Sequence, residues 1–267
     1  MIPLRDNIPA RRLPVVNSGL ILVNVLFFIF ELQLGPGLDS FIRTYGFVPA
    51  RFMAAQSENF LEFERFIPVY SSMFLHGGFL HLISNMWMLW IFGDNVEDSM
   101  GHSRYLVFYL LCGTVSVLAQ TMASPSSPVP LVGASGAIAG VLGAYFLLYP
   151  GARILTLVPL FFFFYLIELP AFLFLGFWIL LQFMQGFTTM ATTEGSGAGG
   201  IAWWAHIGGF AAGVLLINLF KEKPKLWAVT RIRLVDDWKI PDPPAGSFPG
   251  LPFLIFIEFA CQMDNSD

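Results

Sequence analysis

Six long apolar stretches are the feature that most restricts what this chain can fold into. The 267 residues are 56% hydrophobic and 12% charged, whereas a soluble domain carries about 25% charged residues. A helix needs about 20 apolar residues to cross the hydrocarbon core of a bilayer. The stretches lie at residues 17–34, 79–92 (or from 69), 105–122, 131–149, within 154–187, and 200–220. The sequence therefore predicts an all-α, polytopic bundle of six transmembrane helices in a lipid bilayer.

The fifth stretch is too long for one straight crossing. Pro159, Glu168 and Pro170 interrupt its first half, so we expect an interfacial piece first and the true span after Pro170. The connection 35–68 mixes apolar residues with charges, which is typical of an amphipathic piece lying in the interface. The small, Gly-rich residues 188–200 predict a loop that can move over the outer side.

Basic residues predict the orientation and three regions. With a cytoplasmic N-terminus, eleven Lys and Arg residues fall on the cytoplasmic side and three on the outer side, as the positive-inside rule requires. The eleven are Arg5, Arg11, Arg12, Arg104, Arg153, Lys221, Lys223, Lys225, Arg231, Arg233 and Lys239; the three are Arg43, Arg51 and Arg65. We expect a cytoplasmic segment at 1–16, the six-span domain at 17–220 and a cytoplasmic tail at 221–267, with a Pro-rich part at 241–252.

The remaining composition excludes several classes of site. Cys112 and Cys261 are too few for a disulfide framework or a zinc cage. The chain has no HExxH motif for a zinc protease, and Asp94 lacks the second acid of an aspartyl pair. We expect no metal, no cofactor and no nucleic-acid partner. No cleavage site follows the first apolar stretch, so we interpret it as a retained span.

Four polar residues from three spans fall at one level. Ser135 and His206 lie near the starts of the fourth and sixth spans, and His81 and Asn85 lie near the outer part of the second. These spans run in the same direction, which places all four on the order of 10 Å below the outer surface. Alone, the serine or asparagine is explained by helix packing. Together they indicate a Ser–His nucleophilic pair, and these three spans contain no Asp or Glu near that level.

Small residues surround this pair. Gly136 and Gly140 in the fourth span, and Gly209 and Gly213 in the sixth, have the spacing of closely packed membrane helices. Close approach of these two spans is what a Ser–His contact needs. Gly133 would keep the approach to the serine open.

Three motifs together resemble the rhomboid family of intramembrane serine proteases. They are His81-x-x-x-Asn85, Gly133-x-Ser135-Gly136 and Ala205-His206-x-x-Gly209-x-x-x-Gly213, within a likeness that covers residues 10–220. The resemblance implies that Ser135 is the nucleophile and His206 the general base. It implies that Asn85, His81 and the backbone N–H of Ser135 stabilise the oxyanion. The substrates would be single-span or multi-span membrane proteins, cleaved near the outer face.

Two further expectations concern the surroundings of the pair. The family often has an aromatic residue one turn after the serine, stacked on the histidine, but here that residue is Ala139. Tyr145, Trp203 and Trp204 are the candidates to replace it. His76 and Ser84 are expected near the water that proteolysis consumes.

Alternative functions stay open at this stage. A catalytically inactive rhomboid-like protein that binds or escorts membrane clients would keep the fold but lose the serine or histidine, and both are present. A small transporter would favour internal repeats and acidic residues at mid-membrane, which the sequence lacks. The six-span core without an added span suggests a bacterial plasma membrane. The substrate, the oligomeric state and the role of the tail do not follow from the sequence.

Overall fold

The computed structural model describes residues 1–54, 63–160, 163–192 and 202–222. These residues belong to one compact unit, Met1–Lys223, and the second unit, Pro224–Asp267, lies outside them. The loop predicted at 188–200 is wrong for its first five residues, because the helix that begins at Ala171 continues to Thr192. The rest of that loop, the Pro-rich part of the tail and Cys261 lie outside the residues that the structure describes.

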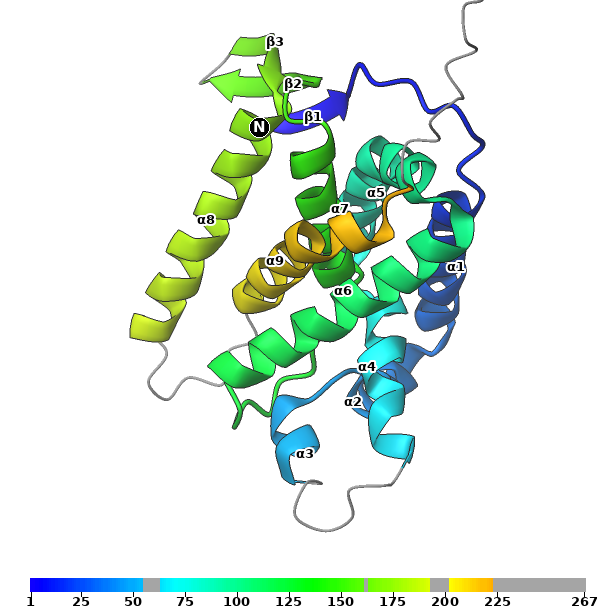
Figure 1. Ribbon diagram of the computed structural model, residues 1–267. Coiled ribbons are helices and arrows are strands. Elements are labelled where there is room, and N and C mark those ends of the chain that lie inside the picture. Colours follow the sequence, from blue (N-terminus) through cyan, green and yellow to red (C-terminus); the bar gives the residue numbers. More distant parts are fainter. Residues whose placement is uncertain (55–62, 161–162, 193–201, 223–267) are drawn as a thin grey trace, which may run out of the picture. The chain divides into compact units, whose positions relative to one another are not determined.

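A helix forms in each of the six apolar stretches (Figure 1). The helices are α1 (Val15–Gln33), α5 (Phe79–Met100), α6 (His102–Ala123), α7 (Ser135–Leu148), α8 (Ala171–Thr192) and α9 (Trp203–Phe220). Among the described residues, four of them are long and apolar enough to span a membrane: α1, α6, α8 and α9. A fifth candidate is the pair of segments Glu64–Phe74 and Phe79–Met100, which is bent by 83°. The protein is thus a mostly helical, multi-pass membrane protein.

Helices α5 and α7 do not by themselves have the length and hydropathy of a membrane span. Helix α5 carries His81, Asn85, Asp94 and Asn95, and these polar residues lower its mean hydropathy. Helix α7 has only 14 residues, so it rises about 21 Å, less than the thickness of the hydrocarbon core.

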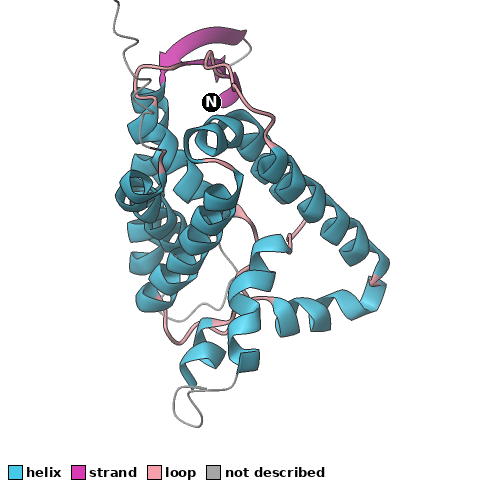
Figure 2. Ribbon diagram, turned by 45° about the vertical axis from the view of Figure 1, so that its right-hand side comes forward, coloured by secondary structure: helices cyan, strands magenta, loops and turns pink. Residues whose placement is uncertain are grey.

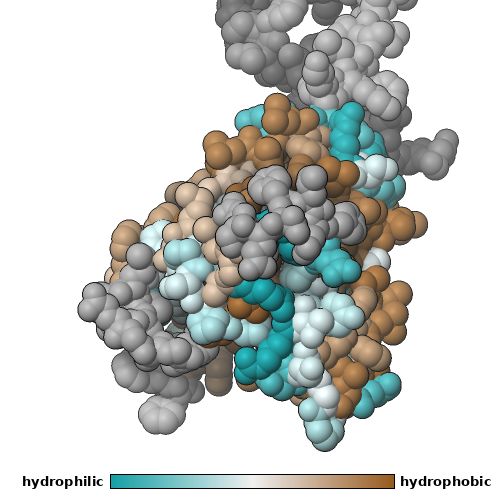
Figure 3. All heavy atoms as spheres, turned by 90° about the horizontal axis from the view of Figure 1, so that it is seen from below, coloured by the Kyte–Doolittle hydropathy of each residue, from teal (hydrophilic) through white to brown (hydrophobic). Residues whose placement is uncertain are grey.

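Short helices connect α1 to α5 at one end of the bundle. They are η1 (Gly35–Gly37), α2 (Leu38–Tyr45), α3 (Pro49–Ala54), η3 (Phe63–Phe66), α4 (Ile67–Ser71) and η4 (Ser72–Phe74). The Arg51 guanidinium donates to the carbonyls of Arg43, Thr44 and Gly46 at the end of α2, at 2.6, 3.2 and 3.0 Å. Figure 3, seen from this end, shows hydrophilic side chains along the middle of the face with hydrophobic surface beside them. This mixed surface suits a segment at a membrane interface.

A small antiparallel sheet at the other end corrects the all-α prediction. It consists of β1 (Ile2–Arg5), β2 (Arg153–Leu160) and β3 (Phe163–Pro170), in the order β1-β2-β3 (Figure 2). The residues before Pro170, expected to form an interfacial piece, form this β2–β3 hairpin, in which Ile154 pairs with Leu169. Its Val, Ile, Leu, Phe and Tyr residues favour strands. The third strand comes from the N-terminus, where Ile2 pairs with Leu157, a long-range pairing that apolar run length does not reveal.

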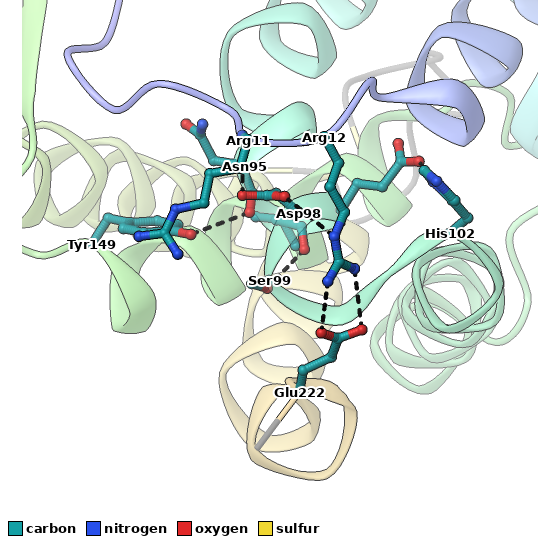
Figure 4. A network of polar contacts seen from close by, with 10 residues as sticks. Arg11, Arg12, Asn95, Asp98, Ser99, His102, Tyr149 and Glu222 are labelled. Carbon is teal, nitrogen blue, oxygen red and sulfur yellow. Dashed lines mark hydrogen bonds and ion pairs between the residues drawn. The ribbon is translucent and has the colours of Figure 1, made fainter. Parts of the chain in front are cut away.

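The N-terminal segment is tied to the helix ends by a polar network (Figure 4). The Glu97 carboxylate accepts the N–H groups of Val16 at 3.0 Å and Asn17 at 2.7 Å, and it also contacts His102 Nδ1. It thereby caps the first turn of α1, whose own N-cap residue, Pro14, makes no side-chain hydrogen bond. Arg12 forms a two-point ion pair with Glu222, at 3.1 and 3.0 Å.

Candidate active site

Ser135 and His206 come together although they are 71 residues apart. His206 Nε2 lies 2.8 Å from Ser135 Oγ. Ser135 is the first residue of α7, and His206 lies in the first turn of α9. Both side chains are half-buried, so the pair lies at the rim of the helix bundle and is not sealed in its core.

Glycines in α7 and α9 explain why these two helices bring the pair into contact. A Cβ on Gly209 would lie 2.0 Å from the carbonyl oxygen of Gly136, and one on Gly213 would lie 1.9 Å from that of Gly140. Real atoms never approach so closely, so any larger residue would push the helices apart. Every residue of α7 from Gly136 to Tyr145 is buried. The fourth and sixth helices thus lie as close together as the spacing of their glycines predicts.

The other face of His206 is supported by α8. Nδ1 of His206 lies 2.7 Å from Oε1 of Gln182, a residue that is 7% exposed. The ring of Trp178, one turn earlier in α8, lies 6.0 Å from the imidazole at an interplanar angle of 35°. The ring of Trp203 meets the imidazole edge-on at 6.3 Å. Sequence reasoning missed Gln182 and Trp178; the only signal was that Gln182 is one of two glutamines in a mostly apolar helix.

The expectation for Tyr145 was wrong. Its hydroxyl donates to Asp6 Oδ2, and its ring packs against Phe92. Ten residues of α7 separate it from Ser135, which is about 15 Å along the helix axis. Ala139 is fully buried, and a Cβ on Gly209 would lie 3.3 Å from the Cβ of Ala139. An aromatic side chain at residue 139 therefore has no room between these helices, and α8 supplies the ring instead.

His81 and Asn85 lie against the loop that leads into Ser135. A Cβ on Gly133 would lie 2.7 Å from His81 Nε2 and 3.7 Å from Asn85 Nδ2. Gly133 has a φ of +122°, which side-chain-bearing residues rarely adopt, and its N–H donates to the Ser72 carbonyl at 2.8 Å. Only glycine fits both the conformation and the space at this point.

The hydrogen-bond donors near Gly133 have fixed positions but no acceptor within the described residues. The N–H of Gly77 approaches His81 Nδ1 at 3.4 Å, which leaves the proton of a neutral imidazole on Nε2, the atom beside Gly133. Asn85 is 6% exposed, and its Nδ2 has no hydrogen-bond partner among the described residues. As the first residue of α7, Ser135 has a backbone N–H without a partner inside the helix. Three donors from two helices thus surround one small region.

A cavity of about 30 Å³ lies beside Ser135, enough for about one water molecule. Ser72 and Ser116 are among the residues that line it. The residues expected near water do not line it. Ser84 is exposed and bonds the His81 carbonyl, and His76 is buried with its ring packed on His81 at 5.2 Å.

The described residues hold no group of three or more His, Cys, Asp or Glu side chains that could bind a metal ion. Cys112 is buried in α6 as a free thiol. The arrangement provides a hydroxyl, an imidazole in contact with it and nearby N–H donors. These are the groups that acyl transfer by a serine nucleophile needs.

Comparison with known proteins identifies the family of this chain. The model of the Rhomboid domain matches residues 64–223, more than half of the chain. The chain is 33% identical over 153 residues to the mitochondrial Rhomboid protein 1 of Saccharomyces cerevisiae, covering 56% of this chain and 40% of that protein. It is 27% identical over 214 residues to the mitochondrial Presenilin-associated rhomboid-like protein of Bos taurus, covering 77% and 48%.

A bacterial relative is similar over a shorter stretch. The Rhomboid protease GluP of Bacillus subtilis is 44% identical over 70 residues, covering 26% of this chain and 13% of that protein. The matched stretches cover less than half of each of these three relatives.

Proposed function

The chain belongs to the rhomboid family, and we propose that it is a serine endopeptidase that hydrolyses peptide bonds in or near the transmembrane segments of membrane proteins. The observation that supports this most strongly is the 2.8 Å contact between Ser135 Oγ and His206 Nε2. The glycine packing of α7 against α9 holds both residues in this position. Among the relatives is a protein named a rhomboid protease.

In the proposed reaction, Ser135 attacks the carbonyl carbon of the scissile peptide bond. His206 Nε2 takes the hydroxyl proton as the new C–O bond forms. The carbonyl oxygen becomes an oxyanion, for which His81 Nε2, Asn85 Nδ2 and the backbone N–H of Ser135 are the available donors. Such donors act on charge that exists only during the reaction, so they lower the barrier without holding the substrate more tightly.

The imidazolium of His206 then protonates the leaving amine, and the C–N bond breaks to give an acyl-enzyme on Ser135. A water molecule, deprotonated by His206, attacks the ester and regenerates the serine hydroxyl. The cavity beside Ser135, which Ser72 and Ser116 also line, is a suitable place for that water. No step requires a metal ion or a cofactor.

We also propose six spans, with both termini in the cytoplasm and the pair near the outer face. Helix α7 rises about 21 Å, about 9 Å less than the hydrocarbon thickness. If its far end reaches the cytoplasmic interface, Ser135 lies on the order of 10 Å below the outer surface. The excess of basic residues on the proposed cytoplasmic side agrees with this orientation. Reaction of single cysteines with an impermeant thiol reagent, at residues 10 and 40, tests it directly.

The compartment is a separate question. The relatives include two proteins named as mitochondrial and one from a bacterium. They do not support the expectation of a bacterial plasma membrane over other membranes, so the proposal is limited to an integral membrane enzyme.

The experiment is cleavage of single-span model substrates by the purified protein in vesicles, beside Ser135→Ala and His206→Ala. We expect cleavage by the wild type and loss of at least about 10³-fold in either variant. A metal chelator should leave the rate unchanged. Undiminished cleavage by either variant would remove the Ser–His mechanism, and binding of clients without any cleavage by the wild type would favour the inactive, escorting alternative.

A further inference from the structure

His206, the general base in the proposed reaction, uses both of its ring nitrogens. One contacts Ser135 in α7, and the other contacts a residue of α8. Nδ1 of His206 lies 2.7 Å from Gln182 Oε1, while Nε2 lies 2.8 Å from Ser135 Oγ. The imidazole is therefore held between α8 on one side and α7 on the other. Gln182 is 7% exposed in a helix that is otherwise strongly apolar.

An amide oxygen fixes the protonation of the ring. It can only accept a hydrogen bond, so the proton of a neutral imidazole must be on Nδ1. Nε2 is then unprotonated and can accept the proton of Ser135. The opposite tautomer would donate from Nε2 to the serine and could not act as a base. In soluble serine proteases a buried aspartate performs this task, but the hydrogen bonds of the His206 ring within the described residues go to Gln182 and Ser135.

We propose that Gln182 is a positioning residue that fixes the tautomer and orientation of His206, an inference that rests on the proposed function. Trp178 lies one turn earlier in α8, and its ring faces the same imidazole. One helix thus supplies both the hydrogen bond and the ring contact that Ala139 cannot supply. Gln182 acts through His206 and does not contact the scissile bond.

An amide suits this position better than a carboxylate. A buried charge in a membrane helix is expensive, whereas a buried amide needs only its hydrogen bonds. The amide orients the imidazole without that cost. It also stabilises the imidazolium less than a carboxylate would, so replacing the amide by an acid has a distinct and measurable consequence.

The test compares Gln182→Met, Gln182→Glu and the matched control Gln185→Met in the cleavage assay. Methionine has nearly the same length as glutamine but no acceptor for Nδ1. We expect kcat of Gln182→Met to fall about ten- to thirtyfold, with KM within about twofold. Gln185 is exposed three residues further along the same helix, so its substitution by methionine should leave kcat unchanged. Thermal unfolding of each variant checks that it is folded.

Gln182→Glu distinguishes positioning from simple packing. A carboxylate keeps the acceptor for Nδ1, so activity should be restored at high pH. Its charge favours the imidazolium, so the acidic limb of the kcat–pH profile should move to higher pH than in the wild type. A purely structural role for Gln182 would not move that limb.

The possible results separate this inference from the proposed function. Wild-type kcat in folded Gln182→Met, or an unmoved acidic limb in Gln182→Glu, overturns the positioning role while Ser135→Ala still abolishes cleavage. If Ser135→Ala cleaves as fast as the wild type, the proposed function itself fails. If Gln182→Met does not fold, the pH profile of Gln182→Glu alone decides the question.

Discussion

A buried carboxylate at one end of the helix bundle, Glu97, and a buried amide at the other end, Asn85, are used in opposite ways. At the end with the sheet, the Glu97 carboxylate is 2% exposed and accepts two backbone N–H groups of α1, and Arg12 pairs with Glu222 (Figure 4). At the other end, Asn85 Nδ2 and both ring nitrogens of His76 are buried without a hydrogen-bond partner in the described part of the chain.

This difference indicates that Glu97 serves stability and that Asn85 can serve chemistry. A buried polar group without a partner costs about 1–3 kcal/mol, so a folded protein keeps one only where another role outweighs the cost. The Asn85 amide can find its partner in a reacting substrate. The Glu97 carboxylate already has its partners. Substitution of Glu97 should therefore change stability, and substitution of Asn85 should change turnover.

The largest stability effect is expected for Glu97→Ala. This change removes the cap of α1 and leaves the N–H groups of Val16 and Asn17 without their acceptor. We expect a loss of about 3 kcal/mol in the free energy of unfolding, measured by thermal or denaturant unfolding in detergent micelles. Cleavage per folded molecule should stay within about twofold of the wild type. Glu97→Gln keeps an acceptor oxygen, and a loss equal to that of Glu97→Ala would show that capping is not the cause.

Asn85→Ala should show the reverse pattern. It removes a donor for the oxyanion, so kcat should fall by a factor of about ten to a few hundred. A detectable rate should remain, because His81 Nε2 and the Ser135 N–H are still present. The unfolding temperature should stay the same or rise, because the amide nitrogen has no partner to lose among the described residues. An unchanged rate would mean that Asn85 serves only in packing.

We expect the Asp6 carboxyl to have a smaller effect on stability, and one that depends on pH. Burial raises the pKa of the Asp6 carboxyl above its usual value of 3.8, and the hydrogen bond from Tyr145 opposes that rise. The folded protein therefore binds the proton more tightly than the unfolded chain. Its contribution to stability is fully present below the unfolded pKa and is lost as the pH rises through the folded pKa.

Asp6→Asn removes this titration while an amide oxygen can still accept from Tyr145. As the pH rises above the usual carboxyl pKa of 3.8, the variant should lose less stability than the wild type. Unfolding midpoints measured over this rise in pH check the prediction, and parallel curves for the two proteins would contradict it.

The smallest effect is expected for Arg12→Ala. The Arg12 side chain is 45% exposed, and exposed ion pairs contribute little because water and salt screen them. The unfolding temperature should move slightly at low salt and not at all at high salt. A large shift that persists at high salt would show that the N-terminal segment depends on this pair.

The sequence predicted the helices and the pair because both depend on local patterns. Long apolar runs define the six helices, and Ser135, His206, His81 and Asn85 are unusual residues at fixed places in those runs. Close approach of α7 and α9 followed from the spacing of Gly136, Gly140, Gly209 and Gly213.

Features that depend on long-range contact were not predictable in the same way. Helix α8 is apolar all round, so its sequence does not reveal that Gln182 faces His206. The pairing of residues 2–5 with 153–160 joins distant segments. Tyr145 was a candidate neighbour of His206 only by sequence distance, and the helical rise carries it to the opposite end, against Asp6.

The most direct test of the central claim is the covalent modification of Ser135 by a serine-directed fluorophosphonate, mapped by mass spectrometry in the membrane-embedded protein. The account predicts an adduct on Ser135 in the wild type and labelling at least about a hundredfold slower in His206→Ala, because the hydroxyl then has no base. Equal labelling rates in the two proteins, or an adduct on a different residue, would contradict the claim that Ser135 and His206 act as a nucleophile and its base.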